Sequence, residues 1–385
     1  MHLSTLAGKI RAAVTDPGSF PPTAELDRAW VDVDLAALVS NARMLAGRAA
    51  RPLLPMVKAN GYGLGAVAVA RALEPLAPWG YGVATAEEGR ELREAGIERP
   101  IVAFTPLLPL QVERFAGLDL RPAVGDPSAL EAWLAGAPGR PFHLEIDTGM
   151  SRGGVRWDDA PALDRIADLM AGDGGSAWEG VFTHFHSADC EPGACAEQWE
   201  RLHAALARLP GRPPLVHAAN SAGALLGSAY AGDLVRPGIY LYGAGGGEPA
   251  PRPVAALRAR VVACRRLAAG DPVSYGCTWR AERATTVATL SIGYADGVHR
   301  SLGNRGHVDL GGAAAPIVGR VTMDMTMVAV PDDRPAPRPG DVATIFGGRV
   351  ALDAQAEAAG TIAYELLTAL GHRLPRRYVR EEESR

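Results

Sequence analysis

Long apolar runs are missing from this chain of 385 residues. No segment approaches the roughly 18 uninterrupted apolar residues that indicate a membrane-spanning helix. The N-terminal stretch MHLSTLAGKIRAAVTDPGSF has no apolar core followed by a small-residue cleavage site, as a secretory signal would. We therefore expect a cytoplasmic protein.

Cysteine is scarce, with only Cys190, Cys195, Cys264 and Cys277 present. These residues form no CxxC motif and no His/Cys pattern at the spacing of a zinc site. We expect reduced thiols in ordinary packing positions, and neither disulfides nor a bound metal.

Net charge is also small, at −4 with a pI near 6.2. Such a balance gives no electrostatic reason to expect nucleic acid or an anionic membrane as a partner, so we expect a small molecule. Hydrophobic residues make up 48% of the chain, which is enough for real cores. The length is too great for one ordinary compact domain, so two domains are the natural expectation.

The first half alternates short apolar runs with charged, alanine-rich stretches typical of helices. Among the expected helices are residues 66–73, 87–95, 162–170 and 194–209. The expected strands are residues 30–34, 53–58, 81–85, 101–104, 120–124, 142–147, 180–185 and 215–218. Repeated strand-then-helix order predicts parallel strands with right-handed crossovers. Eight such units suit an α/β fold of the (β/α)₈, TIM-type barrel class.

After Pro251 the pattern changes to Val-, Thr- and Ile-rich runs separated by turn glycines and prolines. The expected strands here are residues 254–267, 285–292, 307–310, 316–330 and 341–346. This pattern predicts a β-rich C-terminal domain. We expect an N-terminal extension at 1–28, a barrel at 29–248 and the β-rich domain at 249–385.

Polar residues gather where the expected barrel strands end. Lys58 ends the second strand, residues 147–152 follow the sixth, His184 lies at the end of the seventh, and Asn220 and Ser221 follow the eighth. Arg236 and Gly238 come shortly afterwards in VRPGIYLYG. Barrel enzymes place their chemistry at these strand ends, so the grouping indicates an active site.

Lys58 follows an apolar run and precedes a glycine-rich turn in PMVKANGYGLG. One interpretation is a lysine that extends into water from a strand end. The other is a desolvated amine that acts as a base or forms a Schiff base. Ser221 and the backbone N–H groups at Gly238 and Ile239, near expected helix N-termini, could hold a phosphate. A phosphate site opposite a reactive lysine favours pyridoxal 5′-phosphate as the cofactor.

Nine segments of the chain resemble those of the alanine racemase family in content, order and approximate spacing. They are MVKANGYGLG, EIDTGMSRGG, GVFTHFHSAD, HAANSAG, VRPGIYLYG, DPVSYG, SIGYADG, GRVTMDM and TIAYE. The resemblance covers residues 29–378, almost the whole chain. It implies a pyridoxal-phosphate enzyme with a barrel and a β-domain that interconverts L-alanine and D-alanine.

The resemblance also implies a role for each matching residue. Lys58 would be the Schiff-base lysine, Arg236 would face the pyridine nitrogen, and Arg152 would lie beside the phenolic oxygen. His184 would contact the cofactor ring, near Asn220. The residues matching the phosphate contacts are Tyr62, Ser221, Gly238, Ile239 and Tyr364.

Four residues of the β-rich domain match positions that act on the substrate or its entrance. Tyr275 would be a second catalytic base, opposed to Lys58 across a planar carbanion. Met323 would contact the substrate carboxylate, and Tyr294 and Tyr364 would narrow the entrance. In the family Tyr275 and Met323 reach the site from a partner subunit, which implies a head-to-tail homodimer.

Some positions depart from the family pattern. Leu64, His186 and Thr322 differ from the residues common there, which leaves the amino-acid substrate open, with serine as an alternative to alanine. Glu145 stands where many members carry a lysine that becomes a carbamate and steadies the arginine matching Arg152. A glutamate would supply that carboxylate permanently, and we expect it to pair with Arg152.

Two rival functions remain. A pyridoxal-phosphate amino-acid decarboxylase shares the same two-domain plan, but its family uses an acidic partner at the pyridine nitrogen, which Arg236 does not match. A non-catalytic carrier of pyridoxal phosphate would need the barrel alone, and the β-rich domain with Tyr275 argues against it. The sequence favours the racemase.

Overall fold

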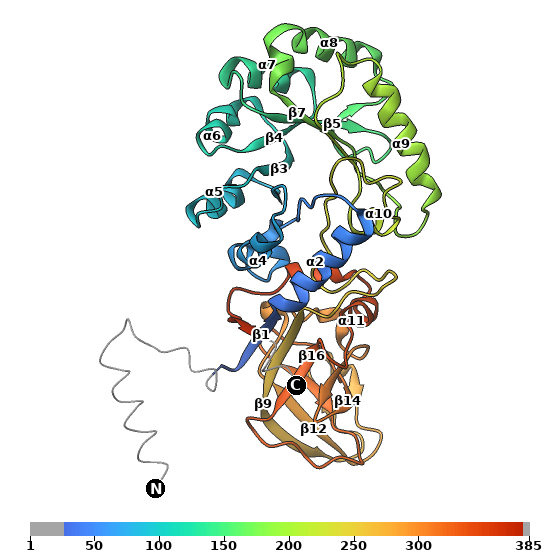
Figure 1. Ribbon diagram of the computed structural model, residues 1–385. Coiled ribbons are helices and arrows are strands. Elements are labelled where there is room, and N and C mark those ends of the chain that lie inside the picture. The colour runs from blue at the N-terminus through green and yellow to red at the C-terminus, as the bar shows by residue number, and fades with distance from the viewer. Residues whose placement is uncertain (1–26, 380–385) are drawn as a thin grey trace, which may run out of the picture.

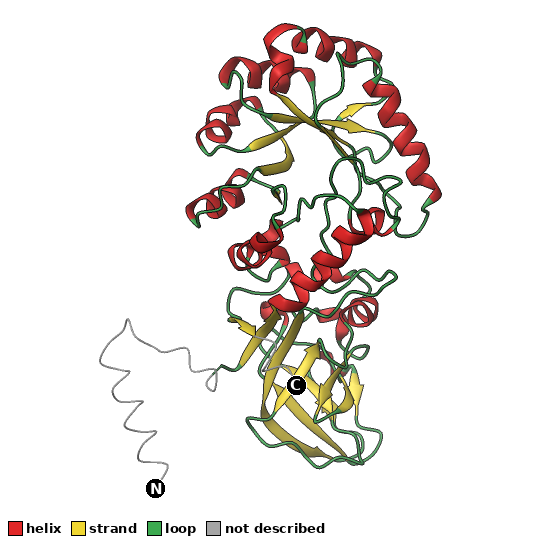
Figure 2. Ribbon diagram, in the orientation of Figure 1, coloured by secondary structure: helices red, strands yellow, loops and turns green. Residues whose placement is uncertain are grey.

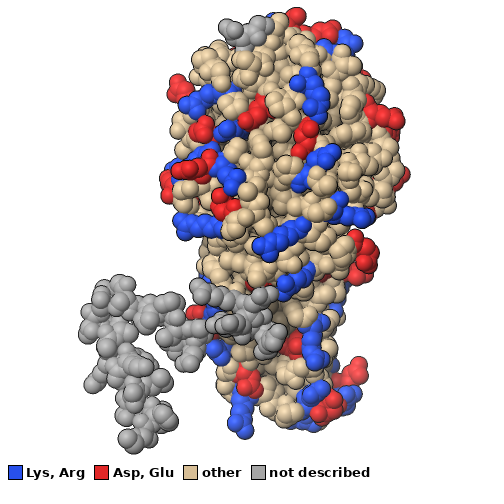
Figure 3. Space-filling model, in the orientation of Figure 1, with Lys and Arg blue, Asp and Glu red and all other residues tan. Residues whose placement is uncertain are grey.

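The computed structural model describes residues 27–379, so the predicted extension at 1–28 lies largely outside the described residues. The chain forms an α/β barrel and a β-rich part stacked end to end (Figure 1). Strands lie inside the upper part and helices around it (Figure 2). On the face in Figure 3, acidic and basic side chains are interspersed.

Parallel strands neighbour one another in chain order around the barrel. They are β2 (Tyr81–Val83), β3 (Ile101–Pro106), β4 (Arg121–Val124), β5 (Phe142–Asp147), β7 (Trp178–Phe182) and β8 (Leu215–His217). The two-residue strand β6 (Val155–Arg156) adds to β5. The alternation of apolar runs and helical stretches in the sequence therefore gives the predicted parallel arrangement.

Two extended segments, residues 53–57 and 234–237, close the ring between β8 and β2. Leu53 bridges Val235, and Met56 bridges Gly82 in β2, both in parallel. The backbone N–H of Arg236 donates to the carbonyl of Ala219, just after β8, at 2.8 Å. The (β/α)₈ barrel is thus confirmed, but residues 234–237 take the place that we predicted for residues 30–34.

Helices cover the outside of the barrel (Figure 2). They are α2 (Leu35–Ala49), α4 (Ala66–Leu73), α5 (Ala86–Glu94), α6 (Val112–Gly117), α7 (Pro127–Gly136), α8 (Ala160–Met170), α9 (Gly193–Leu206) and α10 (Ser221–Leu225). Side chains of Thr85, Asp126 and Asp159 cap the N-termini of α5, α7 and α8, as such residues commonly do. No helix in residues 27–379 combines the length and apolar character needed to cross a membrane.

The β-rich part is built on the long strand β9 (Ala255–Leu267). It pairs antiparallel with β1 (Ala29–Asp34), β12 (Thr285–Leu290) and β16 (Val342–Phe346). The remaining strands are β10 (Pro272–Val273), β11 (Trp279–Arg280), β13 (His307–Leu310), β14 (Ala313–Pro316), β15 (Thr326–Ala329) and β17 (Arg376–Val379). This part also contains two helices that we did not predict, α11 (Leu352–Ala359) and α12 (Ala363–Thr368). It is therefore mainly β and not entirely β.

The position of β1 corrects the sequence prediction. Residues 30–34 were expected to be the first barrel strand, but β1 lies between β9 and β17 in the β-rich sheet. The guanidinium groups of Arg260 and Arg377 lie over the ring of Trp30, at 5.3 and 4.0 Å from its centroid. A short apolar strand carries no local sign of the sheet that it will join, and these tertiary contacts decide it.

Candidate functional site

A cavity of about 320 Å³ opens at the C-terminal ends of the barrel strands. Every residue that the sequence assigned to the cofactor lines it: Lys58, Tyr62, Arg152, His184, Asn220, Ser221, Arg236, Gly238, Ile239 and Tyr364. These residues come from separate strand ends and loops, so the fold brings the predicted cofactor site together in one chain.

Lys58 begins a short turn of unusual conformation, α3 (Lys58–Tyr62). Ala59, Asn60 and Tyr62 have φ values of 52°, 55° and 53°, a left-handed conformation that costs about 1–2 kcal/mol per non-glycine residue. The carboxylate of Glu88 on α5 accepts a hydrogen bond from the backbone N–H of Ala59 at 2.7 Å. The surrounding contacts therefore hold Lys58 at a fixed position on the cavity wall.

The surroundings of Lys58 lower the pKa of its amine. Burial is the main cause that lowers its pKa, and the charge of Arg152 and then that of Arg236 lower it further, while Glu88 opposes the shift. A lysine with a lowered pKa can act as a base or attack a carbonyl carbon. The geometry therefore favours the reactive interpretation of this residue over the solvent-exposed one.

Ser221 and Gly238 form a small polar cradle. The Ser221 hydroxyl accepts hydrogen bonds from the backbone N–H groups of Gly238 (2.9 Å) and Tyr240 (3.4 Å). A Cβ atom at Gly238 would overlap the hydroxyl of Tyr62, so this glycine permits a close approach. Ser221 begins α10, as expected, but Gly238 directly precedes a turn and is not at a helix N-terminus.

Arg236 is a buried cation at the cavity, with only 3% of its surface exposed. Its Nη2 donates to the carbonyl of Thr183 at 2.7 Å and approaches Nδ1 of His184 at 3.3 Å. Burial lowers the pKa of Arg236 to about 9, although the negative charge of Glu145 opposes this. Burial, followed by the charge of Arg236, lowers the pKa of His184 to about 3, so Arg236 stays charged and His184 neutral near neutral pH.

Glu145 lines the cavity from β5 and is 6% exposed. Its Oε2 is buried and has no hydrogen-bond partner. Burial raises the pKa of Glu145 to about 6, while the charges of Arg152 and Arg236 lower it. In the described part of the chain no hydrogen bond or ion pair within 4.0 Å joins Glu145 to Arg152, so the predicted direct pair is absent.

The loop that carries Arg152 is held at its N-terminal end by hydrogen bonds to Asp147. Oδ1 of Asp147, the last residue of β5, accepts hydrogen bonds from the backbone N–H groups of Gly149, Met150 and Ser151 at 2.9–3.0 Å. This arrangement matches the preference of aspartate for turns, where its carboxylate replaces a backbone acceptor. Asp147 therefore supports the loop and does not line the cavity.

Three predicted substrate residues lie apart from this cavity. Tyr275, at the start of the turn η4 (Tyr275–Cys277), is 72% exposed, Met323 is 53% exposed and Tyr294 is 42% exposed. None of them lines the cavity of its own chain. A single chain therefore brings Lys58 together with the cofactor residues but not with Tyr275.

Three of the four departures from the family pattern, Leu64, His186 and Thr322, also lie outside the cavity lining. Leu64 is fully buried in the hydrophobic core. His186 is exposed and contacts the neighbouring Ser187, and Thr322 bonds to the backbone of Met325. Within one chain these three residues do not determine the shape of the site.

Sequence reasoning missed two aromatic walls of the cavity, Phe104 and Phe182. Their rings meet edge to face at 5.1 Å, and the Arg236 guanidinium lies 5.6 and 5.4 Å from their centroids. Both lie near the ends of strands that were predicted, so their position was a usable signal. An apolar ring has no chemical signature in sequence, and polar residues alone were considered.

The residues of the cavity fit pyridoxal 5′-phosphate. The cofactor needs an amine for its aldehyde, donors for its phosphate and a partner for its ring nitrogen. Lys58 offers the amine, and Arg236 is a buried donor at the same cavity. The hydroxyls of Ser221 and Tyr62, the latter lying against Gly238, line the cavity and suit a phosphate.

Comparisons with known proteins agree with this assignment. Residues 33–245 match the family model described as alanine racemase, N-terminal domain, and residues 254–378 match alanine racemase, C-terminal domain. The alanine racemase of Salinispora tropica is 41% identical over 91% of this chain and 98% of its own length. That of Symbiobacterium thermophilum is 41% identical over 91% and 96%.

Solved structures give the same result. A Bartonella henselae alanine racemase with covalently bound pyridoxal phosphate superposes with a TM-score of 0.86 at 33% identity, covering 92% of this chain and all of the other. An alanine racemase of Streptomyces lavendulae superposes with a TM-score of 0.83 at 34% identity, over 94% of this chain and 98% of the other. The likeness thus extends over both parts of the fold.

Proposed function

Because the chain belongs to the alanine racemase family, we propose that it interconverts L-alanine and D-alanine with pyridoxal 5′-phosphate and uses Lys58 and Tyr275 as two opposed bases. The observation that carries the residue assignment is the cavity itself. Ten residues taken from separate sequence segments line one cavity around a lysine whose pKa is lowered by burial.

Lys58 would hold the cofactor, Ser221, Gly238, Ile239, Tyr62 and Tyr364 would bind its phosphate, and Arg236 would face its ring nitrogen. When bound, the cofactor withdraws electrons from the substrate and makes the α-hydrogen acidic. Arg236 donates a hydrogen bond but keeps its proton, because its pKa of about 9 still lies above neutral pH. With Arg236 as its partner, the ring nitrogen would therefore have no strong proton donor beside it.

Racemisation needs a proton acceptor on one face of Cα and a proton donor on the other. The Lys58 amine, with its lowered pKa, would exchange a proton on one face. The Tyr275 hydroxyl would exchange it on the opposite face, and the Met323 backbone would orient the substrate carboxylate with Arg152. The roles reverse with the direction of the reaction.

Tyr275 would reach the cavity from a second copy of the chain. Tyr275, Tyr294 and Met323 are exposed in one chain, although large apolar side chains usually avoid water when a partner can cover them. A homodimer whose sites are completed across the interface accounts both for their exposure and for their absence from the cavity lining of their own chain. We place this dimer in the cytoplasm.

The test is to incubate the holoenzyme with L-alanine and to measure D-alanine by chiral chromatography. We expect D-alanine from the wild type and none from Lys58→Ala. Release of carbon dioxide would support a decarboxylase, and no turnover of any common L-amino acid would support a carrier. A faster reaction with serine than with alanine would correct the substrate.

A further inference from the structure

Arg236 has no carboxylate bonded to it, although it is a buried cation. Its guanidinium donates to the carbonyl oxygens of Thr183 (2.7 Å) and Ala218 (3.0 Å), and to Nδ1 of His217 (2.7 Å). Within residues 27–379 no Asp or Glu lies within 4.0 Å of it as an ion pair. A buried charge requires compensation from its surroundings, so its hydrogen-bonded neighbours need an explanation.

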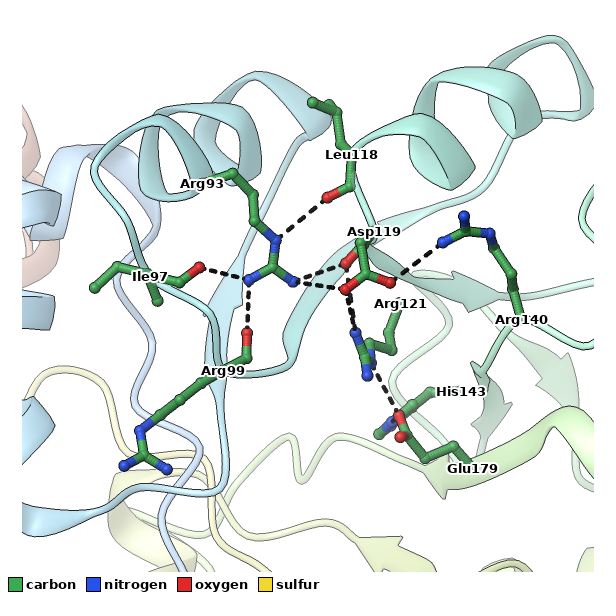
Figure 4. Close-up of polar contacts among 9 residues, drawn as sticks. All are labelled: Arg93, Ile97, Arg99, Leu118, Asp119, Arg121, Arg140, His143 and Glu179. Carbon is green, nitrogen blue, oxygen red and sulfur yellow. Dashed lines mark hydrogen bonds and ion pairs between the residues drawn. The ribbon is translucent and has the colours of Figure 1, made fainter.

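Two fully buried histidines link Arg236 to a carboxylate. Nε2 of His217 lies 2.8 Å from Nδ1 of His143, and Nε2 of His143 lies 3.1 Å from Oε2 of Glu179. Figure 4 shows Glu179 beside His143 and Arg121, whose Nε lies 3.4 Å from the same carboxylate oxygen. We call Arg236, His217, His143 and Glu179 the two-histidine chain. It crosses the barrel from the cavity to the N-terminal ends of the strands.

The groups at its two ends determine where the protons lie. A guanidinium can only donate hydrogen bonds, and an ionised carboxylate can only accept them. His217 must therefore accept at Nδ1 and carry its proton on Nε2. His143 must then accept at Nδ1 and donate from Nε2 to Glu179. With neutral imidazoles, only this arrangement satisfies all three hydrogen bonds.

Burial keeps both imidazoles neutral. It is the largest cause that lowers the pKa of His217, and the charge of Arg236 adds to it. Burial also lowers the pKa of His143, although Glu179 opposes the shift. For Glu179 burial acts in the opposite direction, but the hydrogen bond from His143 and the charge of Arg121 hold its pKa below the usual value. The carboxylate is therefore ionised.

We propose that His143 and Glu179 are positioning residues for Arg236, which act through His217 to hold the guanidinium in one orientation at the cavity. The proposal rests on the proposed function, in which Arg236 faces the cofactor ring. It explains why polar side chains occupy positions on β5, β7 and β8 where branched aliphatic residues usually fill a barrel. Glu179 also supplies the negative end of a chain that begins with a buried cation.

The alternative is that these residues only fill space. The ring of His217 stacks on Phe182 with a centroid distance of 5.3 Å, so the region is packed as well as hydrogen-bonded. If packing were the whole role, a side chain of the right size at position 179 would suffice. If the two-histidine chain positions Arg236, a hydrogen-bond acceptor at position 179 is required.

The experiment compares Glu179→Leu, which removes the acceptor, with Glu179→Gln, which keeps it. In folded holoenzyme the Leu variant should lose about tenfold or more in kcat, whereas the Gln variant should stay within about threefold of the wild type. KM for alanine should change little in both variants, because residue 179 does not line the cavity. Nitrogen-15 NMR of labelled histidine should find His143 and His217 protonated on Nε2 in the wild type, and this single state should be lost in the Leu variant.

Arg140→Gln is the matched control. Arg140 bonds to Asp119 at 3.3 Å, near Arg121 and Glu179 (Figure 4), but it does not contact the two-histidine chain. Both kcat and the two histidine tautomers should therefore be unchanged. If Glu179→Leu does not fold, His143→Phe carries the same test, since it leaves His217 without its acceptor.

Three results would overturn the proposal. They are wild-type kcat with unchanged tautomers in a folded Leu variant, equal losses in the Leu and Gln variants, and a proton on Nδ1 of either histidine in the wild type. The tautomers and the dissociation constant of the cofactor can be measured in a protein that does not racemise alanine. A failure of the proposed function is therefore seen separately.

Discussion

Lys58 is held in surroundings that change its chemistry. An ordinary lysine is protonated at neutral pH and can neither accept a proton nor attack an aldehyde. Here burial, aided by the charges of Arg152 and Arg236, lowers the pKa of the amine, and only Glu88 opposes this. The neighbours of this residue thus favour the reactive interpretation over the solvent-exposed one.

We predict that borohydride fixes the cofactor on Lys58, because this amine lies at the cavity with a lowered pKa. The chain has only two lysines, Lys9 and Lys58, so mass spectrometry of a digest separates the possibilities. Lys58→Arg should carry no label. A label on the peptide containing Lys9 would contradict the assignment.

Glu145 is the other residue whose environment predicts a measurable effect. Glu145→Gln keeps the size of the side chain but removes the negative charge that acts on Arg152 and Arg236. We expect kcat to fall by about tenfold, because the two guanidinium groups lose their nearest buried carboxylate and shift. Steady-state kinetics measure this, and unchanged kinetics with the cofactor bound would refute it.

The same substitution should lower kcat but raise the free energy of unfolding relative to the wild type as the pH rises. The folded-state pKa of Glu145 is raised from 4.5 to about 6, so wild-type stability falls by about 2 kcal/mol as the pH rises through that interval. The Gln variant lacks this fall. Denaturant unfolding of cofactor-free protein should find Glu145→Gln gaining on the wild type between about pH 4 and pH 8, and parallel pH profiles would contradict the assigned burial.

At the scale of elements, the loop that follows the closing segment 234–237 illustrates how the backbone shapes the site. Gly238 lies against Tyr62, which stacks on Tyr242 with a centroid distance of 4.4 Å. The Tyr242 hydroxyl donates to the carbonyl of Met56, two residues before Lys58, at 2.8 Å. The cradle at Gly238 and the turn that carries Lys58 are therefore packed into one unit.

We predict that Gly238→Ala weakens cofactor binding and destabilises the protein by about 1–3 kcal/mol, because the new methyl group overlaps the Tyr62 hydroxyl. Thermal unfolding and cofactor titration measure the two effects. Gly117→Ala in α6 is the control, since nothing lies within 4 Å of the added methyl there. Adding Tyr62→Phe to Gly238→Ala should restore part of the stability, and no restoration would contradict the overlap.

Sequence patterns predicted many helices and strands of both parts because each has its own periodicity and turn residues. The bounds of β5, β13 and α4 are those expected. The closing segment 234–237 was missed because RPG and the glycines after it read as a loop. Similarly, nothing in AWVDVD states that β1 pairs with β9, since that pairing is a tertiary contact between segments far apart in sequence.

The cavity residues were predictable where chemistry needs a particular side chain at a strand end, as with Lys58 and Arg236. His143 and His217 were not predicted, because a histidine inside an apolar strand has no sequence sign of its partners. Their role depends on a chain of contacts between β5, β7 and β8. Such contacts exist only after the barrel has closed.

At the scale of the whole molecule, one chain supplies an incomplete site. Lys58 lies in the barrel cavity, whereas Tyr275 is exposed on the β-rich part and does not line that cavity. Opposed proton transfer requires both groups at one Cα atom. The central claim is therefore that each site of a dimer takes Lys58 from one chain and Tyr275 from the other.

Mixing two inactive variants tests that claim most directly. Lys58→Ala and Tyr275→Phe should each lack racemase activity when pure. After the two are dissociated, mixed in equal amounts and reassociated, half of the dimers are hybrids with one intact site, so about a quarter of the wild-type activity should return. If Lys58 and Tyr275 act within one chain, or if Tyr275 is not a base, the mixture will show no more activity than its two components, and that result would contradict the account.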